Sequence, residues 1–307
     1  MRAMTIPHFG DADLFTAADL PDPAPGPGQV LVRVSHAGVN PVDHKMRDGS
    51  SKFVADFTEA DFPFVLGREA SGVVEALGEG VDDLAVGDAV FGIADSGCYA
   101  ELALMPAEGV ATVPEDGDLS VFGGLALAGS TAWNAVHDLA RVSEGDVVLV
   151  HGGGGGVGQI MVQLAKQAGA EVWTTASARH AAKLARWGVG HIDYETQDFT
   201  RVCPPPTVVL DGVYFGTYEK SIEMLSPGDR MVVLPTLADL GPAQEAGLEV
   251  SIPSAAPRPG RLDKLAAMVA EGRLEIEVGQ VLALEDVAEA HRLVEAGHAP
   301  GKVVLEV

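Results

Sequence analysis

The pattern of apolar positions along the chain changes near residue 120. Beyond it, short apolar runs alternate with segments whose apolar residues recur at helical spacing, which is typical of βαβ units and a parallel sheet. The predicted strands are 147–150, 171–175, 191–192, 208–210, 231–234 and 248–252, and the clearest helices are 156–169 and 180–187. Six strands with helical crossovers predict an α/β fold built on a doubly wound parallel sheet.

The first part of the chain follows a different pattern, rich in glycine and proline, with short β-like runs at 30–34, 71–76 and 89–93. This is typical of an irregular, mostly β domain. The end of the chain predicts a helix at 261–271, a β-like stretch at 275–284, a helix at 284–295 and a strand at 302–306. We interpret this tail as a return to the first domain, so that one domain comprises 1–120 and 256–307 and the other 121–255.

Composition limits the classes of function. At 307 residues, 47% of them hydrophobic, the chain is long enough for two packed cores. The 20 Lys and Arg against 44 Asp and Glu give a net charge of −24, which disfavours nucleic-acid and membrane-surface binding. The two cysteines, Cys98 and Cys203, indicate neither a disulfide framework nor a cysteine-rich metal site. No apolar stretch fits a secretory signal or a membrane span, so we expect a cytoplasmic protein.

A glycine-rich loop is the strongest single motif. The apolar strand 147–150 leads into a loop that opens an amphipathic helix, with the spacing Gly153-x-Gly155-x-x-Gly158. This context is typical of a dinucleotide site, because glycines let backbone amides approach a pyrophosphate at a helix N-terminus. The residues expected at the phosphates are Gly152, Gly153, Gly154, Gly155, Gly156, Val157 and Gly158.

The end of the next strand bears on which nicotinamide cofactor binds. NAD-binding proteins place an acidic residue there to hold the ribose hydroxyls. This chain has Ser177, Arg179 and His180, and no carboxylate occurs before Asp193. A hydroxyl, a guanidinium and an imidazole suit a 2′-phosphate, so we predict NADPH. The alternative is that Arg179 is an ordinary solvated residue.

Several stretches together resemble the medium-chain dehydrogenase/reductase superfamily, and its zinc-independent quinone oxidoreductase branch in particular. They are Ala37-Gly-Val-Asn40-Pro-Val-Asp43, Phe64-Val-Leu-Gly67-Arg-Glu69-Ala-Ser-Gly72, Val86-Gly-Asp88-Ala-Val-Phe-Gly92, Gly97-Cys-Tyr99-Ala-Glu101, Ala128-Gly-Ser-Thr131-Ala-Trp, the glycine loop, His191-Ile-Asp-Tyr194 and Gly301-Lys-Val-Val. The resemblance implies a GroES-like β domain, a Rossmann NADP-binding domain, and a homodimer formed through the Rossmann sheet.

The resemblance also bears on metal binding, because a catalytic zinc needs three protein ligands. In the resemblance to the zinc alcohol dehydrogenases, the first two ligand positions correspond to Asn40 and Arg68, and the third falls near Leu127. All three ligands therefore look replaced. We therefore predict no metal site. A different zinc site using His36, His44 or Asp43 is the alternative.

The resemblance further implies roles for individual residues. Asn40 would donate to the substrate oxygen, and Thr131 would contact the nicotinamide ribose or carboxamide. Tyr194, Val213, Leu234 and Thr236 would line the cofactor cleft. Each has a structural alternative: Asn40 before Pro41 favours a turn, Asp43 could orient local backbone, Arg68 and Glu69 could form a buried pair, and Tyr99 could be a core residue rather than a proton donor.

Hydride acceptors that need no metal are those that delocalise the incoming charge themselves. Quinones and conjugated carbonyls do so, leaving only a hydrogen-bonded oxygen and a proton to supply. We therefore predict an NADPH-dependent reductase of a quinone or enone. The alternatives are a 2-alkenal or enoyl reductase, and a non-catalytic NADPH-binding protein.

Overall fold

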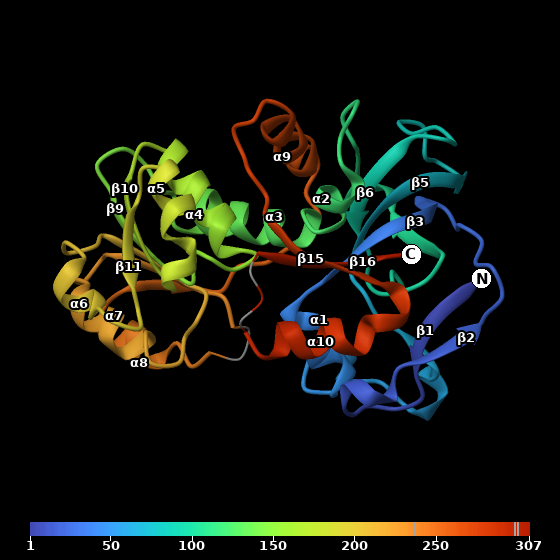
Figure 1. The fold of residues 1–307 in the computed structure, drawn as a ribbon, viewed down its shortest axis with the longest axis horizontal. Helices are drawn as coiled ribbons and strands as arrows, with labels where there is room; N and C mark the ends of the chain where they lie inside the picture. The colour runs from blue at the N-terminus through green and yellow to red at the C-terminus, as the bar shows by residue number, and fades with distance from the viewer. Residues whose placement is uncertain (236–237, 298, 300) are drawn as a thin grey trace. The chain divides into compact units, whose positions relative to one another are not determined.

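The computed structural model describes residues 1–235, 238–297, 299 and 301–307, and the chain forms two compact units (Figure 1). The first unit comprises Met1–Leu127 and Ala256–Val307, and the second comprises Ala128–Ala255. The boundary between the units lies after Leu127, whereas the sequence predicts it after residue 120. The second unit is therefore an insertion into the first.

The second unit is built on a six-stranded sheet in which all neighbouring strands are parallel. Its strands are β9 (Val147–His151), β10 (Glu171–Ala176), β11 (Gly190–Asp193), β12 (Val208–Asp211), β13 (Arg230–Val233) and β14 (Glu249–Ser251). The spatial order β11-β10-β9-β12-β13-β14 is the doubly wound order in which the chain returns to the middle of the sheet after its third strand. The predicted fold class is confirmed.

Alternation along β9 places apolar side chains on both faces of this sheet. Leu149 faces a core cluster that includes Phe199, Tyr218 and Met231, whereas Val148 and Val150 lie outside that cluster and are fully buried. The helices of this unit are α4 (Gly158–Gln167), α5 (Ala181–Arg186), α6 (Phe199–Val202), α7 (Tyr218–Met224) and α8 (Gly241–Glu245), preceded by most of α3 (Ala126–Trp133). Burial on both faces is what a central parallel strand requires.

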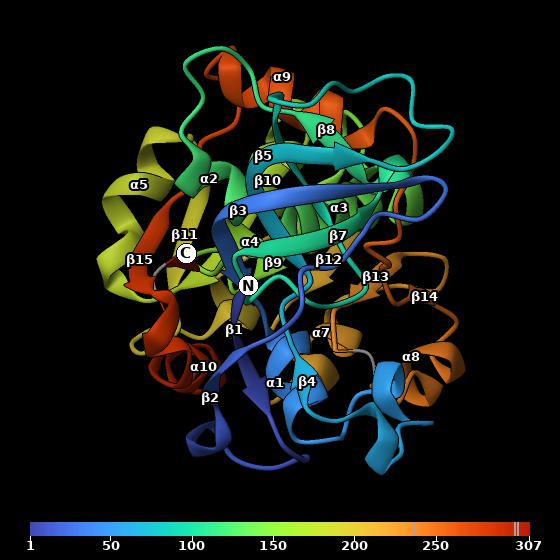
Figure 2. The same cartoon turned by 90° about the vertical axis from the view of Figure 1, so that its right-hand side faces the viewer.

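The first unit is mostly β. One sheet has the order β15-β16-β3-β5-β6-β8, with β7 paired to β3, and a smaller sheet has the order β2-β1-β4 (Figure 2). The bounds are β1 (Arg2–Ile6), β2 (Thr16–Asp19), β3 (Gln29–Val39), β4 (Phe64–Val65), β5 (Glu69–Leu77), β6 (Ala89–Ile93), β7 (Leu102–Pro106), β8 (Val110–Thr112), β15 (Val278–Ala283) and β16 (Lys302–Glu306). The predicted runs 30–34, 71–76 and 89–93 lie within β3, β5 and β6, and the predicted stretch 275–284 contains the shorter β15.

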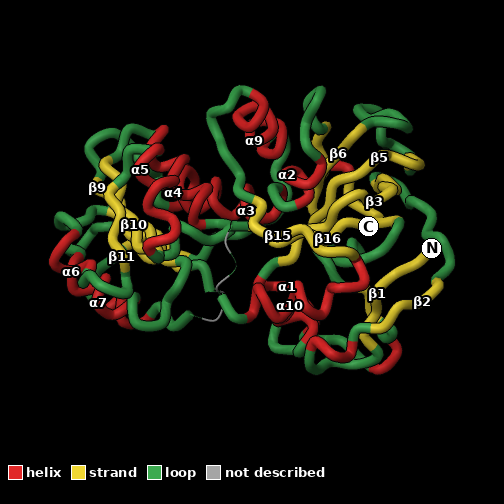
Figure 3. The backbone as a smooth tube through the Cα atoms, in the orientation of Figure 1, coloured by secondary structure: helices red, strands yellow, loops and turns green. Residues whose placement is uncertain are grey.

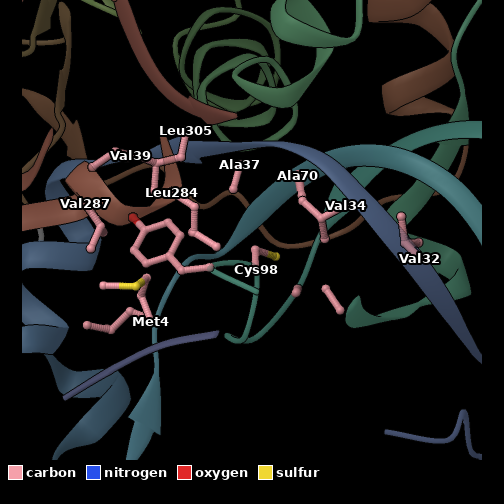
Figure 4. Close-up of a cluster of buried hydrophobic side chains, with 14 of the residues drawn as sticks. Met4, Val32, Val34, Ala37, Val39, Ala70, Cys98, Leu284, Val287 and Leu305 are labelled. Carbon is pink, nitrogen blue, oxygen red and sulfur yellow. The ribbon is translucent and has the colours of Figure 1, made fainter. Parts of the chain in front are cut away.

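The C-terminal segment completes this unit, because β16 lies between β15 and β3 (Figure 3). Its residues Val303, Val304 and Leu305 are almost fully buried. Leu284, Val287 and Leu305 join residues from the N-terminal segment in one core cluster (Figure 4). The helices here are α1 (Pro41–Arg47), α2 (Leu119–Gly123), α9 (Arg261–Ala270) and α10 (Val287–Glu295). None of the described helices is both long and apolar enough to cross a membrane.

Candidate active site

The glycine loop follows β9 directly and ends at Gly158, the first residue of α4. Backbone N–H groups of Gly152 and Gly153 both donate to the carbonyl of Thr175, at 3.1 Å each, so the loop is fixed to the end of β10. The ten-residue α4 begins where the loop ends and contributes the positive end of its dipole there. This arrangement fits a pyrophosphate group.

Close packing explains why glycine is needed at particular positions of the loop. A Cβ atom at Gly158 would lie 2.0 Å from the carbonyl oxygen of Gly152, and one at Gly153 would lie 2.0 Å from Oγ1 of Thr174. Both distances are far below van der Waals contact, so the helix and the loop meet only because these residues are glycines. The bare cradle fits a dinucleotide phosphate.

The residues predicted for cofactor binding lie at the carboxyl edge of this sheet, where open α/β sheets bind ligands. Ser177, Tyr194 and Leu234 are the first residues after β10, β11 and β13. Val213 is the second residue after β12. Thr236 lies outside the described residues. The structure therefore brings four strand ends together with the glycine loop along one edge.

The turn after β10 carries the residues predicted to read the ribose. Ser177 begins a 3-10 turn at 178–180, and the Nε of Arg179 donates to Nε2 of His180 at 3.0 Å. His180 is buried, and a Cβ at Gly154 would lie 2.4 Å from its ring. His180, whose imidazole the sequence analysis expected to suit the 2′-phosphate, thus contacts both the glycine loop and Arg179.

Asp211, the last residue of β12, fixes the turn that follows. Its carboxylate accepts from the N–H groups of Val213 at 2.9 Å and Tyr214 at 2.8 Å, and from the hydroxyl of Thr217 at 2.8 Å. This turn holds Val213 next to the loop, since a Cβ at Gly152 would lie 3.3 Å from the Val213 side chain. Sequence analysis missed Asp211 because a strand-ending Asp is a common turn former.

In the first unit, Asn40 is the N-cap of α1 and is buried. Its N–H donates to Oδ2 of Asp43 at 2.8 Å. Its side-chain Nδ2 donates to Glu69 at 2.8 Å, and its Oδ1 accepts from the ammonium of Lys302 at 2.5 Å. Asn40 therefore starts a helix and also belongs to a buried polar cluster. Thr131, the other residue predicted to act in catalysis, lies in α3 within the second unit.

Glu69 is the centre of this cluster. Oε1 accepts from Asn40 and from Lys302, the latter at 2.9 Å, and Oε2 accepts from the N–H of Leu127 at 2.7 Å. The suggested pair of Arg68 with Glu69 is wrong. Successive residues at the start of a strand point to opposite sides, so Arg68 instead donates to the carbonyl of Asp95 and stacks on Phe53, with 4.1 Å from guanidinium carbon to ring centroid.

A second polar chain runs from Asp43 through the core. Tyr99 Oη donates to Oδ2 of Asp43 at 3.1 Å, His291 contacts the Tyr99 hydroxyl at 3.3 Å, and Arg47 contacts His291 at 3.3 Å. Burial raises the pKa of Asp43 to about 7, against the opposing hydrogen bond from Asn40. Burial, together with the charge of Arg47, lowers the pKa of His291 to about 3. Tyr99 is thus a core residue with a satisfied hydroxyl, and Asp43 does orient the backbone of Asn40.

Comparisons with known proteins agree with this geometry. Residues 26–115 match a model described as the alcohol dehydrogenase GroES-like domain, and residues 187–305 match one described as zinc-binding dehydrogenase. A 2-haloacrylate reductase from Burkholderia sp is 38% identical over 238 residues, which are 74% of this chain and 71% of the relative. The chain belongs to the medium-chain dehydrogenase/reductase superfamily, in its quinone oxidoreductase branch.

Solved structures of the superfamily cover the whole chain. A quinone oxidoreductase from Coxiella burnetii has a TM-score of 0.94 and 34% identity over 100% of this chain and 99% of its own. A mycobacterial structure complexed with NADPH has a TM-score of 0.87, and one titled NAD-dependent alcohol dehydrogenase has 0.89, each with 30% identity and full coverage of both chains. Much longer polyketide synthases also match, and the chain spans 15% of the length of one from Mycolicibacterium smegmatis.

The superfamily includes zinc enzymes, so the fit of a metal can be tested on the donor set. The cluster at Asn40 offers one carboxylate, one amide and a lysine ammonium, and a divalent cation would repel the ammonium. Among the described residues, no three His, Cys, Asp or Glu side chains gather as metal ligands, and the alternative of His36, His44 and Asp43 is therefore not formed. These residues do not fit zinc.

Proposed function

We propose that this oxidoreductase transfers hydride from NADPH to the conjugated position of a quinone or enone without a metal ion. The observation that carries the proposal is the buried cluster of Asn40, Glu69 and Lys302, which offers hydrogen-bond donors where a metal would need ligands. The cofactor supplies the hydride. The electron pair of the conjugated bond moves to the substrate oxygen, where the Asn40 amide donates a hydrogen bond, and water delivers the final proton.

The test of this function is NADPH oxidation by a panel of quinones, enones and enals, with the metal content of the purified protein measured in parallel. We expect turnover with at least one conjugated acceptor and none with simple ketones or alcohols. NADPH binding without oxidation by any acceptor would favour a non-catalytic cofactor-binding protein. Near-stoichiometric zinc, with activity lost to a chelator and restored by zinc, would refute the metal-free mechanism.

The preference for NADPH over NADH rests on Ser177 and Arg179, which stand after β10 where a carboxylate would favour NADH. We expect Arg179→Ala to weaken NADPH binding by roughly 10-fold or more, since one charge-assisted hydrogen bond is worth about 1.5–3 kcal/mol. NADH binding should change little. Fluorescence titration with both cofactors measures this, and tighter binding of NADH by the unaltered protein would contradict the assignment.

A specific observation favours conjugated carboxylates as a second substrate class. Arg68 is flanked in sequence by Gly67 and Glu69, is half-buried against Phe53, and has no carboxylate partner among the described residues. The 38% identical relative is named 2-haloacrylate reductase. If Arg68 binds a substrate carboxylate, Arg68→Gln should raise KM for an acrylate at least about 10-fold while leaving KM for a neutral enone unchanged.

A homodimer formed through the sheet of the second unit belongs to the same proposal. Light scattering of the purified protein at several concentrations tests it. A single species of monomer mass would remove the dimer from the account.

A further inference from the structure

The cluster of Asn40, Glu69 and Lys302 gathers three polar side chains from distant parts of one unit. Asn40 follows β3, Glu69 begins β5 and Lys302 begins β16. Their exposed fractions are 3%, 0% and 3%, so none of the three is solvated to any useful extent. Burying two opposite charges is expensive unless they are paired and hydrogen-bonded. The pairing here, with Glu69 Oε1 2.9 Å from Lys302 Nζ, meets that requirement.

The chemistry of the two charged groups fixes the orientation of the amide. An ammonium can only donate hydrogen bonds, so the atom of Asn40 at 2.5 Å from Lys302 must be the oxygen. A carboxylate can only accept, so the atom at 2.8 Å from Glu69 must be the nitrogen. Rotating the amide by a half-turn would lose both bonds at once. Neither charge alone imposes this orientation as strongly as the pair.

The backbone of Asn40 is held as well. Its N–H donates to Asp43 at 2.8 Å in a capping arrangement at the start of α1. The amide nitrogen carries two hydrogens, of which Glu69 takes one. The second is the donor that the proposed function assigns to the substrate oxygen. Asn40 is therefore a donor whose main chain and side chain are both immobilised.

The surrounding chain leaves room for this pair by omitting side chains. A Cβ at Gly38 would lie 2.3 Å from Oε1 of Glu69, and one at Gly124 would lie 3.1 Å from the Lys302 side chain. Neither glycine has a positive φ. Glycine is needed at both positions because of the close approach of the charged side chains, not because of the backbone conformation. The site is shaped around these two charged groups.

We propose that Lys302 and Glu69 are positioning residues for hydride transfer, which hold the Asn40 amide as a fixed hydrogen-bond donor to the substrate oxygen. The inference rests on the proposed function and gives Glu69 and Lys302 individual roles, whereas that function names a role for Asn40 alone. The ammonium also balances the charge of Glu69 in a cluster whose donor set does not fit zinc. A preorganised donor of this kind stabilises developing charge without reorganisation during the reaction.

The purely structural alternative is that the pair stabilises the fold and does nothing for Asn40. Removing one charge alone would leave the other buried and unpaired, so the test replaces both at once with side chains of similar size, Glu69→Gln with Lys302→Met. The matched control is the Asp146–Arg230 pair of the second unit, replaced as Asp146→Asn with Arg230→Met. Asn40→Ala and the triple variant complete a cycle.

We expect the Glu69→Gln/Lys302→Met variant to lose about 10- to 100-fold in kcat with unchanged Kd for NADPH, while the control keeps wild-type kcat. Adding Asn40→Ala should cost little further, because the pair acts through Asn40. Lys302→Arg, which keeps a donating cation, should regain most of the rate. Two results would overturn the inference. One is a loss of kcat in the triple variant equal to the product of the losses in the pair variant and in Asn40→Ala. The other is a kcat of the pair variant within about twofold of wild type.

A readout that needs no turnover separates this inference from the proposed function. Selective ¹⁵N labelling of asparagine, with the Asn40 side-chain signal assigned by its loss in Asn40→Ala, reports the hydrogen bonding of that amide directly. We expect the signal to shift and its hydrogen exchange to speed up at least about 10-fold in the pair variant but not in the control. Unchanged exchange would refute the positioning role, even if the wild-type enzyme reduced no quinone or enone.

Discussion

Asp43 carries the sharpest conflict between charge and burial near Asn40. It is fully buried, and its Oδ2 accepts from Asn40 and Tyr99, whereas Oδ1 has no hydrogen-bond partner among the described residues. A protonated carboxyl tolerates this environment better than a carboxylate, which is why burial raises its pKa to about 7. The ordinary value of 3.8 applies when the chain is unfolded.

The sign of the effect on stability follows from this raised pKa. Between those two values the folded state holds a proton on Asp43 that the unfolded state has lost, so stability falls as pH rises through that window. Asp43→Asn removes the dependence. Urea unfolding should therefore show the variant gaining about 2–3 kcal/mol relative to wild type between about pH 5 and about pH 8.

His291 provides the control of opposite sign. The pKa of His291 is lowered to about 3 from 6.5. Its contribution to the free energy of unfolding is therefore present above pH 6.5 and is lost as the pH falls below that value. As the pH falls toward about 5, the stability of His291→Gln relative to wild type should therefore rise. That of Asp43→Asn relative to wild type should be smallest there. Parallel pH profiles of both variants and wild type would contradict this account.

At the residue scale, sequence identified Asn40 and the glycines, because each stands in a motif of fixed spacing. It could not identify the partner of Glu69. Glu69 and Lys302 are separated by 233 positions, and only the strand pairing of the folded unit brings them within hydrogen-bonding distance. The sequence suggested the adjacent Arg68 as the partner of Glu69. Successive side chains along a strand point to opposite sides, so Arg68 points away from Glu69.

At the scale of elements, the junction of β9, the glycine loop and α4 is the part of the site that sequence predicts best. A local pattern determines it, since strand, turn and helix follow one another within Val147–His151 and Gly158–Gln167. That the six strands form a doubly wound parallel sheet was also predictable, because strands alternate with helices and right-handed crossovers leave few alternatives. Pairings in the first unit were not, since β16 pairs with β3 across most of the chain.

Gly158→Ala tests the junction. The added Cβ would meet the backbone of Gly152 and Gly153, which cannot rotate away, so the loop must shift. We expect NADPH binding to weaken by at least about 10-fold, measured by titration. Gly26→Ala is a suitable control, because its Cβ would meet only the flexible end of Gln29. Equal affinity in both variants would show that the close packing is not required.

Leu305→Ala tests the docking of β16 between its neighbours. Leu305 is fully buried in the core of the first unit, so truncation leaves a cavity and should cost about 2–5 kcal/mol of unfolding free energy. Val281, on the adjacent strand β15, is 49% exposed, and Val281→Ala should cost well below about 1 kcal/mol. Denaturant titration distinguishes them, and similar losses would mean that β16 is not a core strand in solution.

At the scale of the whole molecule, the net charge of −24 acts on both units at once. Self-repulsion of that size destabilises a compact state, and salt screens it. We expect the thermal unfolding midpoint to rise as NaCl increases from about 0.05 M to about 0.5 M. KCl should give the same rise because screening is not ion-specific, and a midpoint that falls with salt would contradict the argument.

The insertion of residues 128–255 into the first unit has a consequence for synthesis. A ribosome makes roughly 5–20 residues per second, so Glu69 emerges many seconds before Lys302 does. During that interval the carboxylate has no ammonium to meet, and β3 lacks one of its neighbours. The Glu69–Lys302 pair therefore forms only after the inserted unit has been made, when β16 pairs with β3.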